Sequence, residues 1–388
     1  MRYDTARLAD FSVLTAVERR RSFDARFFLL VVVLSAFGVV MVLSASFARA
    51  YYDPSGVTGG RATYYFIRQL VFALLGIAAM LFASRLPMGF YRRYAAAFMA
   101  FTLVLLALVP IIGVRANGSK RWLGVGSLTL QPSELAKLAV ILMFAAMICR
   151  RRGRMNSFRH GILPFLGVLG VIAALLVLEP HFSATVIIFA VGAVMIFLGG
   201  APTGWFAAAF AAGGAGIAVL LTLFPYASSR INTWRDPFSS SSNEGYQIVQ
   251  SLYTIGSGGL GGVGLGASRQ KYLFLPEEHN DFIFAVLCEE LGFIGAVLVL
   301  ILFAMLILRG YCIALRCRDR FSFLVTAGIT TLVAIQVFLN VAVVTNLVPC
   351  TGVSLPFFSY GGTALIIQLA EMGIILSASR DIITEREV

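Results

Sequence analysis

Apolar runs of about 20 residues recur along the whole chain, and a helix of that length crosses the hydrocarbon core of a bilayer. Only 13% of the 388 residues are charged, whereas a soluble domain has about 25%. The sequence therefore predicts an all-α integral membrane protein. We place ten transmembrane helices near residues 27–48, 64–84, 93–112, 133–149, 161–178, 183–200, 205–224, 283–308, 321–345 and 360–379.

The basic residues indicate how these spans cross the membrane. If residues 1–26 are cytoplasmic, the loops on that side carry 20 of the 31 Lys and Arg residues, and the opposite loops carry 10. Cytoplasmic loops are enriched in Lys and Arg. We therefore expect cytoplasmic tails at 1–26 and 380–388, a membrane domain at 27–379, and a large extracytoplasmic loop, 225–282, between helices 7 and 8. The first apolar run lacks a small-residue cleavage site, so it is expected to be a retained helix.

The net charge of +12 does not indicate a nucleic-acid partner, because the basic residues are scattered between hydrophobic segments. The five cysteines show neither metal-binding spacing nor a disulfide framework. The sequence therefore assigns no metal ligands.

Carboxylates gather unusually in one short stretch. Five of the 19 Asp and Glu residues lie between 277 and 290, directly before the apolar segment 293–308. Charged groups at a membrane are costly unless they are paired, solvated or used. Asp281, where the large loop meets the eighth helix, is either an acid that acts on a substrate at the membrane edge or an N-cap of that helix. On a continuous helix Glu289 and Glu290 point away from Asp281, so we expect them to brace neighbouring helices or loop amides.

Charged residues near the extracytoplasmic side of the membrane form a second group of candidates. Glu134 and Lys137 are three residues apart on one side of the fourth helix. They are either a pair that snorkels to the interface or a cation directed into a polar cavity, where it would hold an anionic headgroup.

The segment from Lys120 to Trp122 and the large loop 225–282 carry further basic residues, including Arg121 and Arg230. Arg and Lys bind phosphate through charge-assisted hydrogen bonds, and Trp suits a membrane interface. Plain solvated charge is the alternative for each of these cations.

Glycine-rich stretches and an interruption between two predicted helices mark other segments. Residues 256–266 contain seven glycines, which favours tight packing or backbone approach to a ligand over a nucleotide-binding loop. Gly361 and Gly362, after Ser359, indicate a close-packed helix entry. Glu179 lies at a break between helices 5 and 6, where it either faces a cavity or caps helix 6.

Motifs along most of the chain resemble the SEDS family (shape, elongation, division and sporulation), which includes FtsW, RodA and SpoVE. Two of them, the run from Ser268 to Lys271 and Ser359-Tyr-Gly-Gly, are closer to FtsW and SpoVE than to RodA. Glu179 and Asn280 depart from the residues that many members carry at these places. The matching motifs are Lys120-Arg-Trp, Gln131-Pro-Ser-Glu-Leu-Ala-Lys, Glu179-Pro, Gly245-Tyr-Gln, Gly256-Ser-Gly-Gly, Leu275-Pro-Glu, Asp281-Phe-Ile-Phe, Glu289-Glu-Leu-Gly and Pro356-Phe-Phe-Ser-Tyr-Gly-Gly.

The resemblance implies an inverting peptidoglycan glycosyltransferase that polymerises lipid II at the outer face of the bacterial cytoplasmic membrane, in division or sporulation. Asp281 matches the family's essential acid and would be the base that takes a proton from the acceptor hydroxyl. Cations would stabilise the leaving diphosphate. The implied substrate-binding residues are Lys120, Arg121, Trp122, Glu134, Lys137, Arg230 and Lys271. The implied structural or cavity residues are Glu179, Glu289, Glu290, Ser359, Gly361 and Gly362.

The resemblance also suggests partners and leaves alternatives open. A class B penicillin-binding protein, which is a transpeptidase, and other division proteins are the expected partners. A divalent cation, Mg²⁺ or Mn²⁺, could help with the diphosphate. A lipid II flippase, a scaffold of the division machinery and a RodA-like role in elongation remain alternatives. A transporter is expected to bind near the midplane and often has internal repeats, whereas here the charged motifs gather at one face and no repeat is evident.

Overall fold

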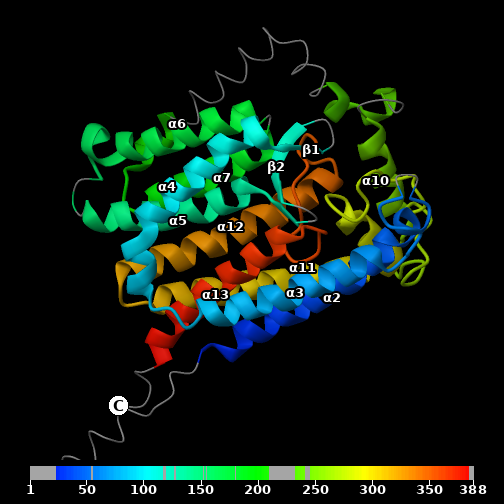
Figure 1. Cartoon of the computed structure of the whole chain (residues 1–388), viewed down its shortest axis with the longest axis horizontal. Coiled ribbons are helices and arrows are strands. Elements are labelled where there is room, and N and C mark those ends of the chain that lie inside the picture. The colour runs from blue at the N-terminus through cyan, green and yellow to red at the C-terminus, as the bar shows by residue number, and fades with distance from the viewer. Residues whose placement is uncertain are drawn as a thin grey trace, which may run out of the picture.

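The computed structural model describes residues 23–383 except 54–55, 117–118, 126–127, 152, 154, 180, 209–231 and 241–244. Long helices make up most of it (Figure 1). The longer helices are α2 (Ala25–Tyr51), α3 (Tyr64–Ala83), α4 (Met88–Ile112), α5 (Pro132–Arg150), α6 (Leu163–Leu178), α7 (Phe182–Leu198), α10 (Tyr246–Ser257), α11 (Ile283–Arg316), α12 (Arg320–Val344) and α13 (Thr363–Ile383). The short elements are the helices η1 (Phe158–Ile162) and η2 (Pro237–Ser240) and the strands β1 (Val114–Ala116), β2 (Ser119–Val125) and β3 (Leu128–Leu130).

Among the described residues, eight helices are long and apolar enough to cross a membrane, and α7 is a shorter apolar helix. These nine coincide with nine of the ten spans that the sequence predicts. The remaining span, near 205–224, falls mostly outside the described residues, so the count of ten stays a prediction. Helix α11 continues beyond the predicted eighth span, from residue 308 to Arg316.

Three helices form the centre of the bundle. Buried residues make up 78% of the apolar window of α5 and 72% of those of α12 and α13, against 28% for α4 and α11. The central helices also carry buried polar side chains, among them Lys137, Asn340 and Gln368. Polar groups inside a membrane protein face the protein interior. The buried polar side chains therefore also indicate that these three helices lie at the centre.

The spans run back and forth along the long axis, so each end of the bundle collects alternate connections (Figure 1). We call the end that carries the strands and α10 the sheet end, and the opposite one the terminal end. At the terminal end both ends of the described chain meet, because the N–H of Asp24 donates to Oγ of Ser379 at 3.1 Å. Both ends therefore lie on one side of the bundle, as the sequence predicts.

A small antiparallel sheet, in the order β1-β2-β3, corrects the purely α-helical prediction. Leu123 lies opposite Leu130 in one pairing, and Val114 lies opposite Trp122 in the other. Strands of three to seven residues give little alternation of polar and apolar residues to detect, so the sequence does not reveal this sheet. The sheet holds the Lys120-Arg-Trp motif at the entrance to the bundle.

The glycine-rich segment 256–266 packs against a kink in α11. At Gly292 the helix breaks, with φ 67° and ψ −169°, a conformation that is essentially restricted to glycine. The break leaves helix backbone groups without partners, and the segment supplies them: Glu289 O accepts from the N–H of Val263 at 3.0 Å, and Gly259 O accepts from the N–H of Phe293 at 2.9 Å. The glycines thus allow backbone to approach backbone, which confirms tight packing.

Candidate functional site

A polar cavity of about 370 Å³ lies at the sheet end, between the sheet, the central helices and the segments that precede α11 and α13. It brings together Asp281, Arg121, Trp122, Glu134, Lys137, Gly361 and Gly362, all of which the sequence analysis singled out. Four residues that it did not assign to a site also line the cavity: Arg68, Glu277, Asn280 and Tyr360.

Asp281 lies in the short segment before α11, and hydrogen bonds from other parts of the chain hold the backbone of this segment. The carbonyls of three successive residues accept hydrogen bonds: His279 from the N–H of Tyr360 at 2.9 Å, Asn280 from Oγ of Ser359 at 2.7 Å, and Asp281 from Nδ2 of Asn340 at 2.8 Å. Buried carbonyls need such partners. The segment is therefore held rigid by α12 and by the residues that precede α13.

The Asp281 side chain is not an N-cap. The N-cap of α11 is Phe282, and no side chain caps this helix end. The carboxylate instead faces the cavity, where a Cβ added to Gly352 would lie 3.0 Å from Oδ2 of Asp281. Only a residue without a side chain leaves that space, and the φ of +57° at Gly352 also favours glycine.

The surroundings make Asp281 a better base than an ordinary aspartate. Burial, followed by the charge of Glu277, raises the pKa of Asp281 to about 6, and Arg121 opposes this rise. A base with a pKa near the working pH combines basicity with availability. Glu277 itself is held by the side chain of Asn280, whose Nδ2 donates to Oε2 of Glu277 at 2.5 Å.

Lys137 and Glu134 form a buried ion pair at the start of α5, with Nζ and Oε2 2.7 Å apart. The Lys137 side chain is only 3% exposed and lines the cavity. It therefore lies in the cavity and does not snorkel to the interface; that it holds an anionic headgroup stays a prediction. Since Glu134 balances most of its charge, Lys137 adds hydrogen-bond donors to the cavity with little net charge.

Adjacent residues of β2 serve different surfaces. Arg121 lines the cavity, whereas Nζ of Lys120 donates to the carbonyl of Pro110 at the end of α4, at 3.2 Å. One cation of the pair thus reaches the cavity, and the other fastens the sheet to the helix.

Glu179 and His181 flank the break between α6 and α7. Both carboxyl oxygens of Glu179 are buried without a hydrogen-bond partner among the described residues, and burial raises its pKa to about 8 despite the charge of Arg121. Burial thus favours the protonated form of Glu179. His181 lines the cavity, and burial, with Arg121 and Lys137 adding to it, lowers its pKa to about 3, so it is neutral.

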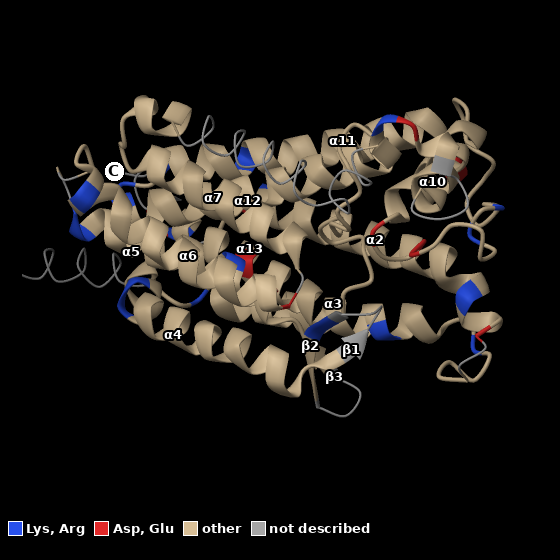
Figure 2. Cartoon of the chain, turned by 90° about the horizontal axis from the view of Figure 1, so that it is seen from above, with Lys and Arg blue, Asp and Glu red and all other residues tan. Residues whose placement is uncertain are grey.

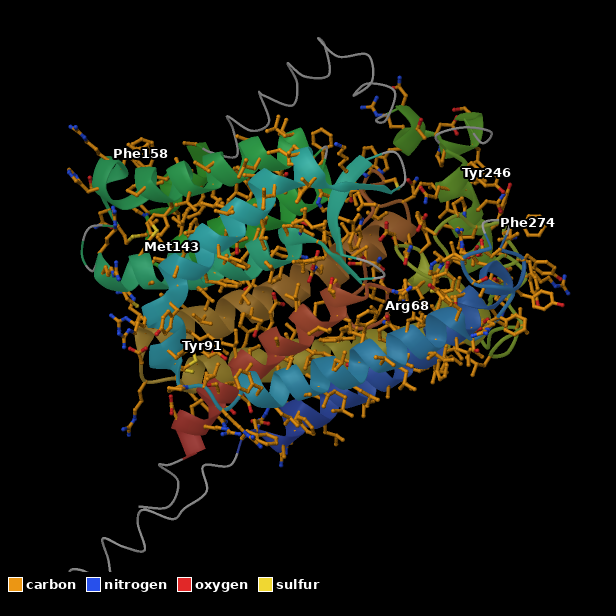
Figure 3. The ribbon with its side chains drawn as sticks, viewed as in Figure 1. Arg68, Tyr91, Met143, Phe158, Tyr246 and Phe274 are labelled. Carbon is orange, nitrogen blue, oxygen red and sulfur yellow. The ribbon has the colours of Figure 1, made fainter. Side chains whose placement is uncertain are left out.

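Arg68 is a cavity cation from another wall. It lies on α3 toward the sheet end (Figure 3), where its Nη1 donates to Oη of Tyr64 at 2.5 Å. Tyr360 lines the same part of the cavity and meets the ring of Tyr65 edge to face, with centroids 5.0 Å apart. The sequence alone does not single out Arg68, because a basic residue at the start of an apolar helix usually serves topology.

Three predicted residues lie apart from the cavity and form a buried network. Nζ of Lys271 is 2.9 Å from Oε1 of Glu290, which also accepts from Oγ of Ser44 on α2. Oε1 of Glu289 accepts from the N–H of Arg269 at 3.1 Å. The two glutamates thus contact a neighbouring helix and loop amides. Lys271, predicted to bind substrate, is engaged in this network instead and does not line the cavity.

Two further points complete the predicted set. Arg230 lies outside the described residues. Within the described part of the chain, no group of three or more His, Cys, Asp or Glu side chains is arranged to hold a metal ion. The cavity thus offers acid, base and cation chemistry from the side chains themselves.

This fold and cavity define a multi-pass α-helical membrane protein that gathers carboxylates and cations at one end of its bundle. The sequence matches the family described as cell cycle protein, with FtsW, RodA and SpoVE, over residues 24–383. The chain belongs to this family.

Individual relatives cover nearly the whole chain. It is 39% identical to stage V sporulation protein E of Bacillus subtilis over 364 residues, which are 93% of this chain and 98% of that protein. It is 36% identical over 381 residues to a probable peptidoglycan glycosyltransferase FtsW of Saccharophagus degradans, with 96% of each chain covered.

Solved structures share the architecture. A chain from a structural study of the coordination of polymerization and crosslinking by a peptidoglycan synthase complex superposes with a TM-score of 0.78 at 30% identity, covering 93% of this chain and 98% of that one. The rod shape determining protein RodA of Thermus thermophilus gives a TM-score of 0.66 at 27% identity, covering 93% of this chain and 97% of its own.

Proposed function

We propose that this protein is a peptidoglycan glycosyltransferase that polymerises lipid II during division or sporulation. The observation that carries the proposal is the position of Asp281: a rigidly held carboxylate with a raised pKa shares a cavity with Arg121 and Lys137. Relatives named probable peptidoglycan glycosyltransferase FtsW, which match more than 90% of this chain, support the same activity.

The reaction follows from the roles of these groups. Asp281 takes the proton from the acceptor sugar's 4-hydroxyl as that oxygen attacks the donor's anomeric carbon. The bond from this carbon to the diphosphate oxygen breaks, and its electron pair leaves with the polyprenyl diphosphate. Attack from the side opposite the leaving group converts an α-linked donor into a β-linked glycan, so one base suffices and no protein nucleophile is needed.

The cations stabilise the charge that develops on the leaving group. Arg121 presents a guanidinium, which binds two phosphate oxygens in one plane, and Lys137 donates hydrogen bonds from its buried ammonium. Such fixed donors act most strongly on charge that appears in the transition state. Arg68, which lines the cavity from α3, is a further cation that would bind the diphosphate of the acceptor substrate.

We also propose that a divalent cation helps to neutralise the charge of the leaving diphosphate. Because the described side chains offer no group of three ligands, the diphosphate itself would supply most of the ligands. No step above depends on this cation.

We place the cavity at the outer face of the cytoplasmic membrane, with both tails in the cytoplasm. Among the described residues, Lys and Arg outnumber Asp and Glu at the terminal end, and most Asp and Glu lie toward the sheet end (Figure 2). The enrichment of cytoplasmic loops in Lys and Arg supports this orientation. A class B penicillin-binding protein is the proposed partner, because a similar chain comes from a complex that couples polymerization with crosslinking.

Flippase activity is the competing function. A transporter binds its substrate near the middle of the membrane, whereas this cavity lies at one end of the helices. That position favours an enzyme that works at one face.

Glycan synthesis from purified lipid II tests the proposal. The protein is assayed with Mg²⁺ and a penicillin-binding protein partner that is inactivated for crosslinking, and wild type is compared with Asp281→Asn. We expect polymer from wild type and at least about 100-fold less from the variant, as general-base catalysis contributes about 10²–10⁴-fold. Equal polymer from both would move the base elsewhere, and no polymer from either, with lipid II crossing liposome membranes, would favour the flippase.

A further inference from the structure

A second cavity, of about 240 Å³, lies at the terminal end, on the far side of the bundle from Asp281. It is built where the start of the described chain meets α11 and α13. The residues that line it are Asp24, Arg309, Cys312, Ile313, Arg316, Ser379 and Ile382.

The contribution of α11 is one face of the helix. Residues 309, 312, 313 and 316 are spaced by three, four and seven positions, so their side chains lie above one another. This face therefore places two guanidinium groups, Arg309 and Arg316, at the edges of one hollow, with the thiol of Cys312 between them.

The two arginines differ in how they are paired. Nη2 of Arg309 lies 2.6 Å from Oδ2 of Asp24, and the other carboxylate oxygen, Oδ1, accepts from the N–H of Phe27 at the start of α2. Asp24 thus fixes Arg309 at the cavity edge. The structure gives Arg316 no ion pair or hydrogen bond with any described residue, and its exposed guanidinium is available to an anion.

Apolar groups complete the site. Ile313 and Ile382 line the hollow, and beside it the exposed surface of α11 carries Leu308 and Leu315, which are 64% and 76% exposed. The cavity therefore lies where a lipid-facing apolar surface gives way to cationic groups, which is the depth at which lipid headgroups lie.

We infer that this cavity binds the phosphate headgroup of an anionic phospholipid. Guanidinium groups bind phosphate oxygens through charge-assisted hydrogen bonds, and basic hollows between transmembrane helices take anionic headgroups. The apolar wall beside the arginines favours a lipid over free phosphate, because the glycerol and acyl chains would contact it. The bound headgroup would add a contact among α2, α11 and α13, whose ends meet here.

The thiol of Cys312 provides a direct readout, because it lines the cavity and is exposed. The full-length protein is placed in nanodiscs of phosphatidylcholine alone or with phosphatidylglycerol, and the rate of modification of Cys312 by a water-soluble maleimide is followed by mass spectrometry. With the anionic lipid at about ten times its dissociation constant, occupancy by mass action slows the modification about tenfold. Equal rates in the two lipid mixtures would overturn the inference.

Variants separate this site from general attraction of charge. Arg316→Gln, at an exposed position, is expected to abolish the protection, Arg316→Lys to keep part of it, and Arg92→Gln, an exposed arginine at the same end that does not line the cavity, to leave it unchanged. Equal loss in Arg92→Gln and Arg316→Gln would contradict a defined site. Protection by millimolar inorganic phosphate in detergent, without any from phosphatidylglycerol, would contradict a lipid ligand.

Discussion

Asp281 lies between charges that oppose each other. Burial and Glu277 raise its pKa to about 6, while Arg121 draws it down. The active form of a general base is deprotonated, so the fraction of active enzyme increases as the pH rises through this pKa.

The rate of glycan synthesis is therefore expected to fall about tenfold per pH unit below about pH 6 and to level off above it. The measurement is the pH profile of kcat/KM for lipid II, which reports the pKa of the free enzyme. Glu277→Gln removes a charge that raises the pKa, so its midpoint is expected at lower pH. Asp236→Asn, which removes an exposed carboxylate outside the cavity, is the control. An unmoved midpoint in Glu277→Gln would show that another group titrates.

Arg121 and Lys120 form a natural matched pair, because they are neighbours on one strand and only Arg121 lines the cavity. Arg121→Gln is expected to lower kcat/KM by about 10- to 100-fold, as a lost hydrogen bond to a charged group is worth about 1.5–3 kcal/mol. Lys120→Gln is expected to change it little. Similar losses in both variants would mean that the strand, and not the Arg121 guanidinium, is what matters.

Residue types alone predicted much of this cavity. Asp281, Arg121, Glu134 and Lys137 were found because charge next to apolar spans is costly and therefore conspicuous. Tyr360 and Asn280 are uncharged, so although the resemblance to the SEDS family draws attention to their segments, only the fold reveals that they face the cavity.

The elements around the site are fixed by polar contacts that no periodicity reveals. Asn340, on α12, donates at 2.8 Å to the carbonyl of Asp281 and at 2.7 Å to that of Val353. One side chain thus fastens the segment before α11 to the loop that carries Gly352. The sequence shows Asn340 only as a polar residue in an apolar span.

Asn340→Leu is expected to leave both carbonyls unpaired, at a cost of about 1–3 kcal/mol each. Glycan synthesis should fall because Asp281 is no longer held in place, and hydrogen exchange of residues 277–283 should accelerate. Thr330→Val is the control, since its hydroxyl donates only within α12, to the carbonyl of Thr326. Unchanged exchange in Asn340→Leu would refute the role of this clamp.

The kink in α11 depends on a single glycine. A Cβ at Gly292 would lie 2.3 Å from the backbone nitrogen of Gly262, and its backbone conformation is closed to other residues. Gly292→Ala is expected to lower the melting temperature in detergent, with strain of about 1–3 kcal/mol from the backbone alone. Gly170→Ala, where an added Cβ meets nothing within 4 Å, should change it little. If the two variants melt alike, α11 can straighten without loss.

Over the whole molecule, hydrophobic length predicted the spans well because the bilayer imposes it, while the packing order of the helices did not follow from it. The central position of α5, α12 and α13 emerges only in the fold. The uneven distribution of charge was visible in the sequence, and most of the described Asp and Glu lie toward the sheet end (Figure 2). The fold adds one cavity at each end of the bundle, with Asp281 in one and Arg309 and Arg316 in the other.

This two-ended arrangement makes the proposed orientation testable with single-cysteine variants. Cys312 is exposed at the terminal end, and Leu260, 73% exposed at the sheet end, is suited to Leu260→Cys. In spheroplasts a membrane-impermeant maleimide should modify Leu260→Cys directly, and should reach Cys312 only after permeabilisation, because moving the arginine-rich end across the membrane is disfavoured. A variant with all five cysteines replaced gives the background. Modification of Cys312 in intact spheroplasts, with Leu260→Cys protected, would invert the topology and would place the Asp281 cavity on the cytoplasmic side, where a polymerase of exported lipid II could not work.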